Sequence, residues 1–198
     1  MLKLGILGST RGSNLLPLIE LLQQRSVPAQ VAVVLSDREQ AGILDTARAH
    51  HWPAFWLSAQ QMSREAYDAM VSARLKDYHC DLVLLLGYMR IVSAPFVQDW
   101  QHRLFNVHPS LLPAHAGKMD RAVHQSVLDA GERESGCTVH EVSEIVDAGP
   151  VLVQITCPVQ ANDDVDSLKA RVQALEVQAL AQAIQQFKLE NRHAICTH

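Results

Sequence analysis

Short apolar runs alternate with helical periodicity over the first half of the chain. Five runs of strand length predict buried strands: Leu2 to Leu7, Val31 to Leu35, Ala54 to Leu57, Leu82 to Leu86 and Leu104 to Val107. Between them, three segments with apolar residues three or four positions apart predict helices: Asn14 to Gln24, Glu39 to His50 and Ser63 to Asp77. This alternation favours an α/β fold, with an open, mostly parallel twisted sheet, Rossmann-like, and helices on both faces.

The pattern changes after about residue 130. Two strand-like runs, Thr138 to Val142 and Val151 to Val159, are separated by Ser143 to Pro150 and predict a pair of antiparallel strands. Apolar residues at helical spacing then predict a long closing helix from Asp166 to Gln186, with Asp163 and Asp164 ahead of it as candidate caps. Because no repeat, linker or second core is visible, we expect one domain over residues 1–198.

Composition narrows the range of partners. A chain of 198 residues can bury a sizeable core, and its net charge of -4 without a long basic run argues against nucleic acid or an anionic membrane as partner. The apolar start, Met1 to Gly8, is too short for a signal peptide, so we expect a cytoplasmic protein with a small soluble ligand. The cysteines lack the spacing of a disulfide framework or metal site; they are Cys80, Cys137, Cys157 and Cys196.

A small-residue loop follows the first predicted strand. Gly8 to Asn14 lies between strand and helix, where backbone N–H groups and the helix dipole face an anion, and Gly12, Ser13 and Asn14 allow close approach of a phosphate. The loop departs from both G-x-G-x-x-G and the Walker pattern, which favours a monophosphate over a dinucleotide or a nucleoside triphosphate. A plain tight turn is the alternative.

Asn106 and His108 lie two residues apart at the end of a predicted strand, so both side chains point to one face. An amide and a protonated imidazole can stabilise an oxyanion, as acyl transfer to an amine requires. Asp147 is a candidate proton acceptor, and a carboxylate near His108 is expected to raise its pKa and favour the charged form. The alternative is an inert histidine at a strand end and an ordinary turn at Asp147.

Taken together, these segments resemble the folate-dependent formyltransferase family, and within it the phosphoribosylglycinamide formyltransferases. The resemblance is nearly end to end, and the run from Asn106 to Pro113 is highly specific for folate-type formyltransferases. The other matching segments are the opening strand with Gly12 to Asn14, then Ser63 to Asp68, Gly87 to Val92, Ser135 to His140 and Asp147 to Gln154.

The resemblance implies formyl transfer from 10-formyltetrahydrofolate to the amine of glycinamide ribonucleotide in purine biosynthesis. It implies a phosphate-binding half at residues 1–100 and a catalytic, folate-binding half at 101–198 of a monomer or homodimer. The implied catalytic residues are Asn106, His108 and Asp147, with Asp147 moving a proton to the folate nitrogen through water. Implied substrate-binding residues are Gly12, Ser13, Asn14 and Glu176; implied folate-binding residues are Arg64, Met89, Arg90, Ile91, Val92, Asn106 and Val146.

The chain departs from the family at two places. Val177 follows Glu176 where the family usually has histidine, and the loop Ala114 to Arg121, a candidate lid, lacks the usual aromatic or histidine-rich pattern. His115 and His124 have no acidic or cysteine partner at regular spacing, so we expect no metal. Two alternatives remain: a relative acting on charged tRNA, a sugar nucleotide or water, and a non-catalytic nucleotide- or folate-binding module.

Overall fold

The computed structural model describes residues 1–195 of the chain, and the side chains of residues 1–190. The strands of this part form one sheet in the order β3-β2-β1-β4-β5-β6-β7. Neighbours from β3 to β5 are parallel, and β6 and β7 are antiparallel. The predicted mostly parallel α/β sheet with an antiparallel C-terminal pair and a long closing helix is therefore confirmed. No helix of the described residues is both long and apolar enough to cross a bilayer.

The chain divides into two compact units. The first comprises Met1–Asn106 and Glu141–Ile145, and the second comprises Val107–His140 and the chain from Val146 onward. The expected organisation as one domain with halves at 1–100 and 101–198 stays a prediction.

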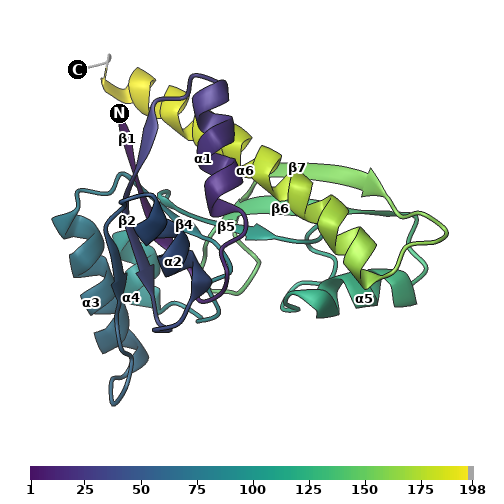
Figure 1. The fold of residues 1–198 in the computed structure, drawn as a ribbon, viewed down its shortest axis with the longest axis horizontal. Helices are drawn as coiled ribbons and strands as arrows, with labels where there is room; N and C mark the ends of the chain where they lie inside the picture. The colour runs from purple at the N-terminus through teal and green to yellow at the C-terminus, as the bar shows by residue number, and fades with distance from the viewer. Residues whose placement is uncertain (196–198) are drawn as a thin grey trace. The chain divides into compact units, whose positions relative to one another are not determined.

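The first unit contains the parallel strands and four helices (Figure 1). Its strands are β1 (Leu2–Leu7), β2 (Ala29–Ser36), β3 (Ala54–Trp56), β4 (Leu82–Leu85) and the beginning of β5 (Leu104–His108). Its helices are α1 (Leu15–Gln24), α2 (Gly42–Ala49), α3 (Arg64–Asp77) and α4 (Ala94–Asp99), with α3 and α4 on one face of the strands and α1 and α2 on the other. Alternate strand residues therefore face different helices, and both sets are mostly apolar.

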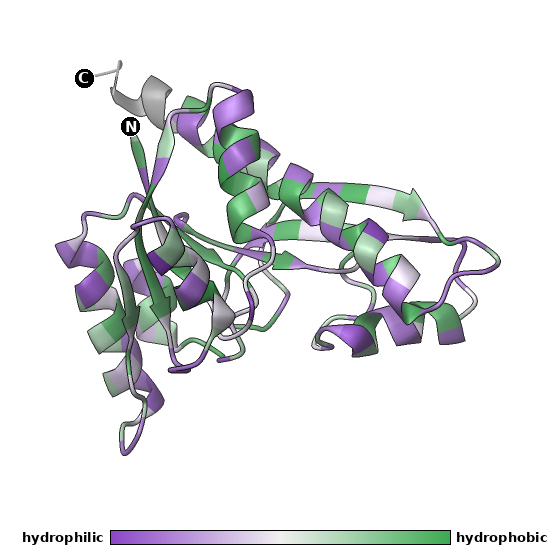
Figure 2. Ribbon diagram, in the orientation of Figure 1, coloured by the Kyte–Doolittle hydropathy of each residue, from purple (hydrophilic) through white to green (hydrophobic). Residues whose placement is uncertain are grey.

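Packing explains why the central positions of these strands are apolar. Leu7, Val83 and Leu85 belong to a core cluster that also contains Val71 of α3 and Phe96 of α4. Figure 2 shows hydrophobic colour along the strands and a mixture of colours on the helices, which have one buried face each. A strand covered by helices on both faces has no solvent side, so it reads as a continuous apolar run.

The second unit contains the end of β5, then α5 (Arg121–Asp129), β6 (Glu134–Glu141), β7 (Val151–Pro158) and α6 (Val165–Ile195). Four apolar residues of α6 are fully buried, namely Leu168, Val172, Leu180 and Ile184. Val123 and Val127 of α5 and Val139 of β6 are buried in the same unit. The apolar positions that predicted the closing helix are thus its buried face.

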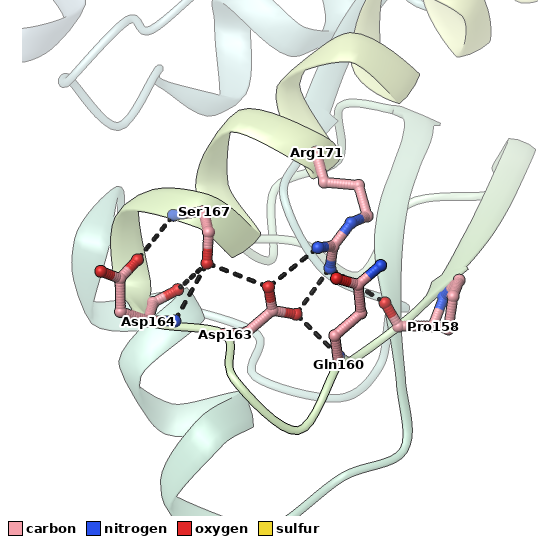
Figure 3. A network of polar contacts seen from close by, with 6 residues as sticks. All are labelled: Pro158, Gln160, Asp163, Asp164, Ser167 and Arg171. Carbon is pink, nitrogen blue, oxygen red and sulfur yellow. Dashed lines mark hydrogen bonds and ion pairs between the residues drawn. The ribbon is translucent and has the colours of Figure 1, made fainter.

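A polar network fixes the start of α6 (Figure 3). The N–H of Ser167 donates to Asp164 Oδ1 at 2.8 Å, and the N–H of Asp164 donates to Ser167 Oγ at 2.9 Å, which is a reciprocal cap. Asp163 instead accepts two hydrogen bonds from the guanidinium of Arg171, at 2.6 and 2.8 Å. Asp164 is therefore the cap that the sequence predicted, and Asp163 anchors the preceding turn to the next turn of the helix.

Some boundaries differ from the predictions. The six residues of α4 and the nine of α5 were not predicted as helices. The strand β6 begins at Glu134, ahead of the predicted Thr138, and α6 continues to Ile195. Cys80, Cys137 and Cys157 are buried free thiols, and Cys196 lies outside the described residues.

Candidate active site

His108 is the last residue of β5, and Asp147 approaches its ring from the loop between β6 and β7. The distance from His108 Nδ1 to Asp147 Oδ2 is 3.4 Å, and the two side chains are only 5% and 8% exposed. Asn106 lies two positions before His108 on the same strand. The structure therefore brings His108 and Asp147 together, as the sequence predicted.

Asp147 raises the pKa of His108, as predicted, but burial outweighs this effect, so the expectation of a protonated His108 was wrong. Burial lowers the pKa of the His108 imidazole below its ordinary value of 6.5, and the opposing effects of Asp147 and of the His115 backbone are smaller. Because desolvation penalises the charged form, the imidazole is mainly neutral at pH 7. His108 Nε2 is buried without a hydrogen-bond partner among the described residues, which is rare for a buried polar atom.

The carboxylate of Asp147 is held from two further directions. The N–H of Gly117 donates to its Oδ2 at 2.8 Å, and Nε2 of the buried His140 lies 3.7 Å from its Oδ1. Asp147 also has a φ of 55°, a left-handed conformation that is unusual for a residue other than glycine. Such conformations persist where the surroundings hold them, and they are common at functional sites.

Thr138 of β6 fixes the backbone that follows His108. Its fully buried hydroxyl donates to the carbonyl of Ser110 at 2.7 Å and accepts from the N–H of Leu112 at 3.1 Å. Gln154 of β7 donates from Nε2 both to Thr138 Oγ1, at 2.8 Å, and to the carbonyl of Leu112, at 3.1 Å. One hydroxyl and one amide thus satisfy the polar backbone of this turn.

The loop from Ala114 to Asp120 is tied to α5 and to the segment after it. His115 Nδ1 lies 2.7 Å from Ser126 Oγ, and His115 Nε2 lies 3.0 Å from Glu132 Oε1. Two residues later, Gly117 makes its hydrogen bond to Asp147. The interactions of His115 therefore help to place the N–H that holds the carboxylate.

The glycine loop lies between β1 and α1, as predicted. Gly12 has a φ of 65°, and a Cβ at this position would lie 2.4 to 2.6 Å from carbons of the Ile43 side chain. Ser13 is exposed and Asn14 is the N-cap residue of α1, with no side-chain cap hydrogen bond. Only glycine fits this turn, and the exposed residues around it lie at a helix N-terminus.

The predicted folate segment follows β4 in the same unit. Met89 and Ile91 are 37% and 48% exposed, whereas the guanidinium of Arg90 lies over the ring of Tyr67, 4.4 Å from its centroid. Arg64 is exposed at the first turn of α3. Because β1, β4 and β5 are parallel neighbours, Gly12, this segment and Asn106 all lie at the carboxyl ends of the strands, where open α/β sheets bind ligands.

Two further predicted site residues are Val146, in the loop between β6 and β7, and Glu176, on α6. Val146 is 42% exposed, next to Asp147, and the neighbouring Ile145 is 73% exposed. Burial raises the pKa of the Cys137 thiol to about 12, and the negative charge of Glu176 adds to this effect. Within the described residues, no three histidine, cysteine or acidic side chains are grouped as a metal site would need.

Comparison with known proteins decides the family. A model of the formyl transferase family, described as "Formyl transferase", matches residues 2–184. The chain belongs to the formyl transferase family. This family member is similar to a phosphoribosylglycinamide formyltransferase of Escherichia coli K12, with 38% identity over 86% of this chain and 80% of that protein. The resemblance expected from the sequence is therefore confirmed.

Solved and curated relatives of this formyl transferase family member agree. The crystal structure of glycinamide ribonucleotide transformylase 1 from Symbiobacterium toebii superposes with a TM-score of 0.87, at 39% identity over 93% of this chain and 86% of that one. The trifunctional purine biosynthetic protein adenosine-3 of Drosophila melanogaster is 41% identical over 92% of this chain. The chain spans only 14% of that protein's length.

Sequence reasoning missed several residues that support the site of this formyl transferase family member. Thr138 and His140 lie two residues apart on β6, so their side chains point to the same face, and both are buried. Two polar residues at this spacing in a strand could have indicated a buried polar site. His115 was weighed only as a metal ligand, and its partners Ser126 and Glu132 became visible only in the fold. Ser9 was not predicted to have any role.

Proposed function

We propose that the protein transfers the formyl group of 10-formyltetrahydrofolate to the amine of glycinamide ribonucleotide, a step of purine biosynthesis. The observation that carries this proposal is the buried pair of His108 and Asp147, in which His108 Nε2 is left without a partner. Family membership and the names of the Escherichia coli and Symbiobacterium toebii relatives support the reaction and the acceptor.

In the proposed reaction, the amine nitrogen attacks the formyl carbon and the carbonyl oxygen becomes an oxyanion. Asn106 donates a hydrogen bond to this oxyanion. Because the His108 imidazole is mainly neutral, its Nε2 first accepts the proton of the attacking amine. The resulting imidazolium then donates a hydrogen bond to the oxyanion. This order replaces the protonated His108 expected from the sequence.

Asp147 stabilises the imidazolium while it exists. Its Oδ2 faces Nδ1 of His108, so the carboxylate favours the tautomer with hydrogen on Nδ1 and a lone pair on Nε2. When the bond between the formyl carbon and N10 of the folate breaks, the proton passes to N10 through water near Asp147. The products are the formylated ribonucleotide and tetrahydrofolate, which carries on N10 the proton that the amine lost.

The remaining roles are proposed residue by residue. Gly12, Ser13 and Asn14 bind the ribonucleotide phosphate, which suits their place at the N-terminus of α1, and Glu176 binds the ribose. The folate contacts Arg64, the segment from Met89 to Val92, Asn106 and Val146. The expectations of a cytoplasmic protein and of a monomer or homodimer stay predictions.

The test is formyl transfer measured by release of tetrahydrofolate from 10-formyltetrahydrofolate, with and without glycinamide ribonucleotide. His108→Ala and Asp147→Asn are expected to lower kcat by about 100-fold or more, the range for a lost acid–base group. His102→Ala is the matched control, because the His102 side chain is 73% exposed and also faces a carboxylate, that of Glu141, at 3.0 Å. Turnover near that of the unmodified protein in His108→Ala or Asp147→Asn would exclude that residue, and no transfer by the unmodified protein would refute the function.

A further inference from the structure

Ser9 is a buried residue at the point where three loops of the first unit meet. It follows β1 and is 3% exposed. Its Oγ lies 2.6 Å from Asp37 Oδ1, in the loop after β2, and the N–H of Met89, in the segment after β4, donates to the same Oγ at 2.8 Å. Its own N–H donates to the carbonyl of Gly87 at 3.0 Å.

The direction of these hydrogen bonds is fixed by chemistry. An ionised carboxylate only accepts, so the Ser9 hydroxyl donates its hydrogen to Asp37. The oxygen lone pairs then face Met89, whose backbone N–H is a donor only. Asp37 thereby orients the Ser9 hydroxyl so that its oxygen accepts the N–H of Met89. Hydrogen bonds linked through one hydroxyl in this way strengthen each other.

The backbone of this segment fits against the first loop with little free space. Gly87 has a φ of 64°, and a Cβ there would lie 2.4 Å from the hydroxyl oxygen of Thr10. At its far end, the N–H of Ser93 donates to the buried carboxylate of Asp68 on α3 at 2.6 Å. The segment from Gly87 to Ser93 is therefore pinned at both ends, and Ser9 supplies two of the hydrogen bonds at the first end.

We propose that Ser9, oriented by Asp37, is a positioning residue that holds the backbone from Gly87 to Met89 in the geometry that binds the folate co-substrate. This inference rests on the proposed function and assigns no contact between Ser9 and a substrate. Ser9 acts by fixing the Met89 backbone before binding, so less conformational freedom is lost when the folate binds.

The experiment compares Ser9→Ala with Ser36→Ala. Ser36 is a matched control, because it is buried at the end of β2 and its Oγ also accepts one backbone N–H, that of Arg38, at 3.0 Å. Ser9→Ala is expected to raise KM for 10-formyltetrahydrofolate about 5- to 20-fold, the effect of one buried hydrogen bond. The KM for glycinamide ribonucleotide and kcat are expected to change less than 3-fold, and Ser36→Ala is expected to leave all three values near those of the unmodified protein.

Amide hydrogen exchange gives a readout that does not depend on activity. The Met89 amide is expected to exchange at least 5-fold faster in Ser9→Ala and at its normal rate in Ser36→Ala. Asp37→Ala should reproduce part of both effects even if Ser9→Ala fails to fold. Asp37→Asn should restore near-normal behaviour, because the amide oxygen still accepts from the Ser9 hydroxyl.

Two results separate the inference from the proposed function. If the unmodified protein transfers the formyl group and both Ser9→Ala and Asp37→Ala keep its folate KM and Met89 exchange, the inference is overturned. If a Ser9 or Asp37 variant changes kcat or the ribonucleotide KM as much as the folate KM, a general structural role replaces the specific one. Without formyl transfer by the unmodified protein, the proposed function fails, and faster Met89 exchange in Ser9→Ala would still establish the backbone contact.

Discussion

The substitution Gly12→Ala tests both the turn after β1 and its packing against α2. Two costs follow from the structure. A non-glycine residue at a φ of 65° costs about 1–2 kcal/mol. The new Cβ would also lie 2.4 to 2.6 Å from the fully buried Ile43 side chain, and crowding of this kind in a packed core costs about 1–3 kcal/mol.

Together these costs predict that Gly12→Ala lowers the free energy of unfolding by about 2–5 kcal/mol. For a chain of this size, the melting temperature should fall by roughly 4 to 20 °C. Urea titration and thermal unfolding followed by circular dichroism give both values. The control is Gly131→Ala, because Gly131 also has a positive φ, 63°, but nothing lies within 4 Å of its added Cβ. Its expected cost is therefore only the 1–2 kcal/mol of the backbone, about half or less.

The double variant Gly12→Ala with Ile43→Ala tests the crowding of the Ile43 side chain separately. Truncation of Ile43 alone should cost about 2–5 kcal/mol, but less when the alanine at position 12 fills part of the space. A coupling of at least about 1 kcal/mol is expected. Equal losses in Gly12→Ala and Gly131→Ala, together with additive effects of Gly12→Ala and Ile43→Ala, would show that the Cβ at position 12 does not crowd Ile43.

Three further predictions concern the second unit. Thr138→Val keeps the shape of the side chain but leaves two buried backbone groups without their partner, so the free energy of unfolding should fall by about 2–4 kcal/mol in urea titration. His115→Phe removes both polar partners of the ring and should lower kcat by about 3- to 30-fold, because the N–H that holds Asp147 is then less well placed. The hydrogen bonds from Arg171 hold the pKa of Asp163 well below its ordinary value of 3.8, so Asp163→Asn should lower the melting temperature at pH 7. This loss should shrink as the pH falls through 3.8 towards the lowered pKa, because the folded state then loses the advantage of the charged carboxylate.

Each of these predictions has an internal comparison. Thr138→Ser keeps the hydroxyl and should retain most of the stability that Thr138→Val loses. Ser126→Ala removes one of the two partners of His115 and should lower kcat less than His115→Phe does. Asp45→Asn removes an exposed ion pair with Arg48. The melting temperature of this variant should therefore follow that of the unmodified protein at every pH. A loss in Asp163→Asn that is the same at pH 3 and pH 7 would contradict the electrostatic explanation.

The strands of the first unit were predictable because burial on both faces makes most of their positions apolar. β1 has the predicted bounds, Leu2–Leu7, and the other parallel strands differ by a few residues at their ends. The short helix α4 was not predicted because six residues make fewer than two helical turns, too few for a pattern of apolar residues to repeat. Only two of its residues, Phe96 and Val97, are buried. β6 was predicted too short because Glu134 to Gly136 has no apolar residue, although Ser135 and Gly136 are buried.

The site was predictable where chemistry was concentrated in one segment, as at Asn106 and His108. It was not predictable where the supporting hydrogen bonds come from residues distant in sequence. Thr138 bonds to Ser110, which is 28 residues away, and Met89 bonds to Ser9, which is 80 residues away. The net direction of the His108 pKa was unpredictable for a related reason. Proximity to a carboxylate was inferred from the motif, but desolvation depends on every element that covers the ring.

The balance at His108 also explains why the carboxylate has to be held so firmly. Burial favours the neutral imidazole, which can accept a proton, while Asp147 at 3.4 Å favours the charged form that appears during proton transfer. If Asp147 moved away, burial alone would act on the ring, and the imidazolium would become more costly to form. The hydrogen bond from Gly117 and the proximity of His140 both oppose such movement. The loop from Ala114 to Asp120 therefore contributes to proton transfer through the position of one backbone N–H, and no side chain of that loop needs to touch a substrate for this effect.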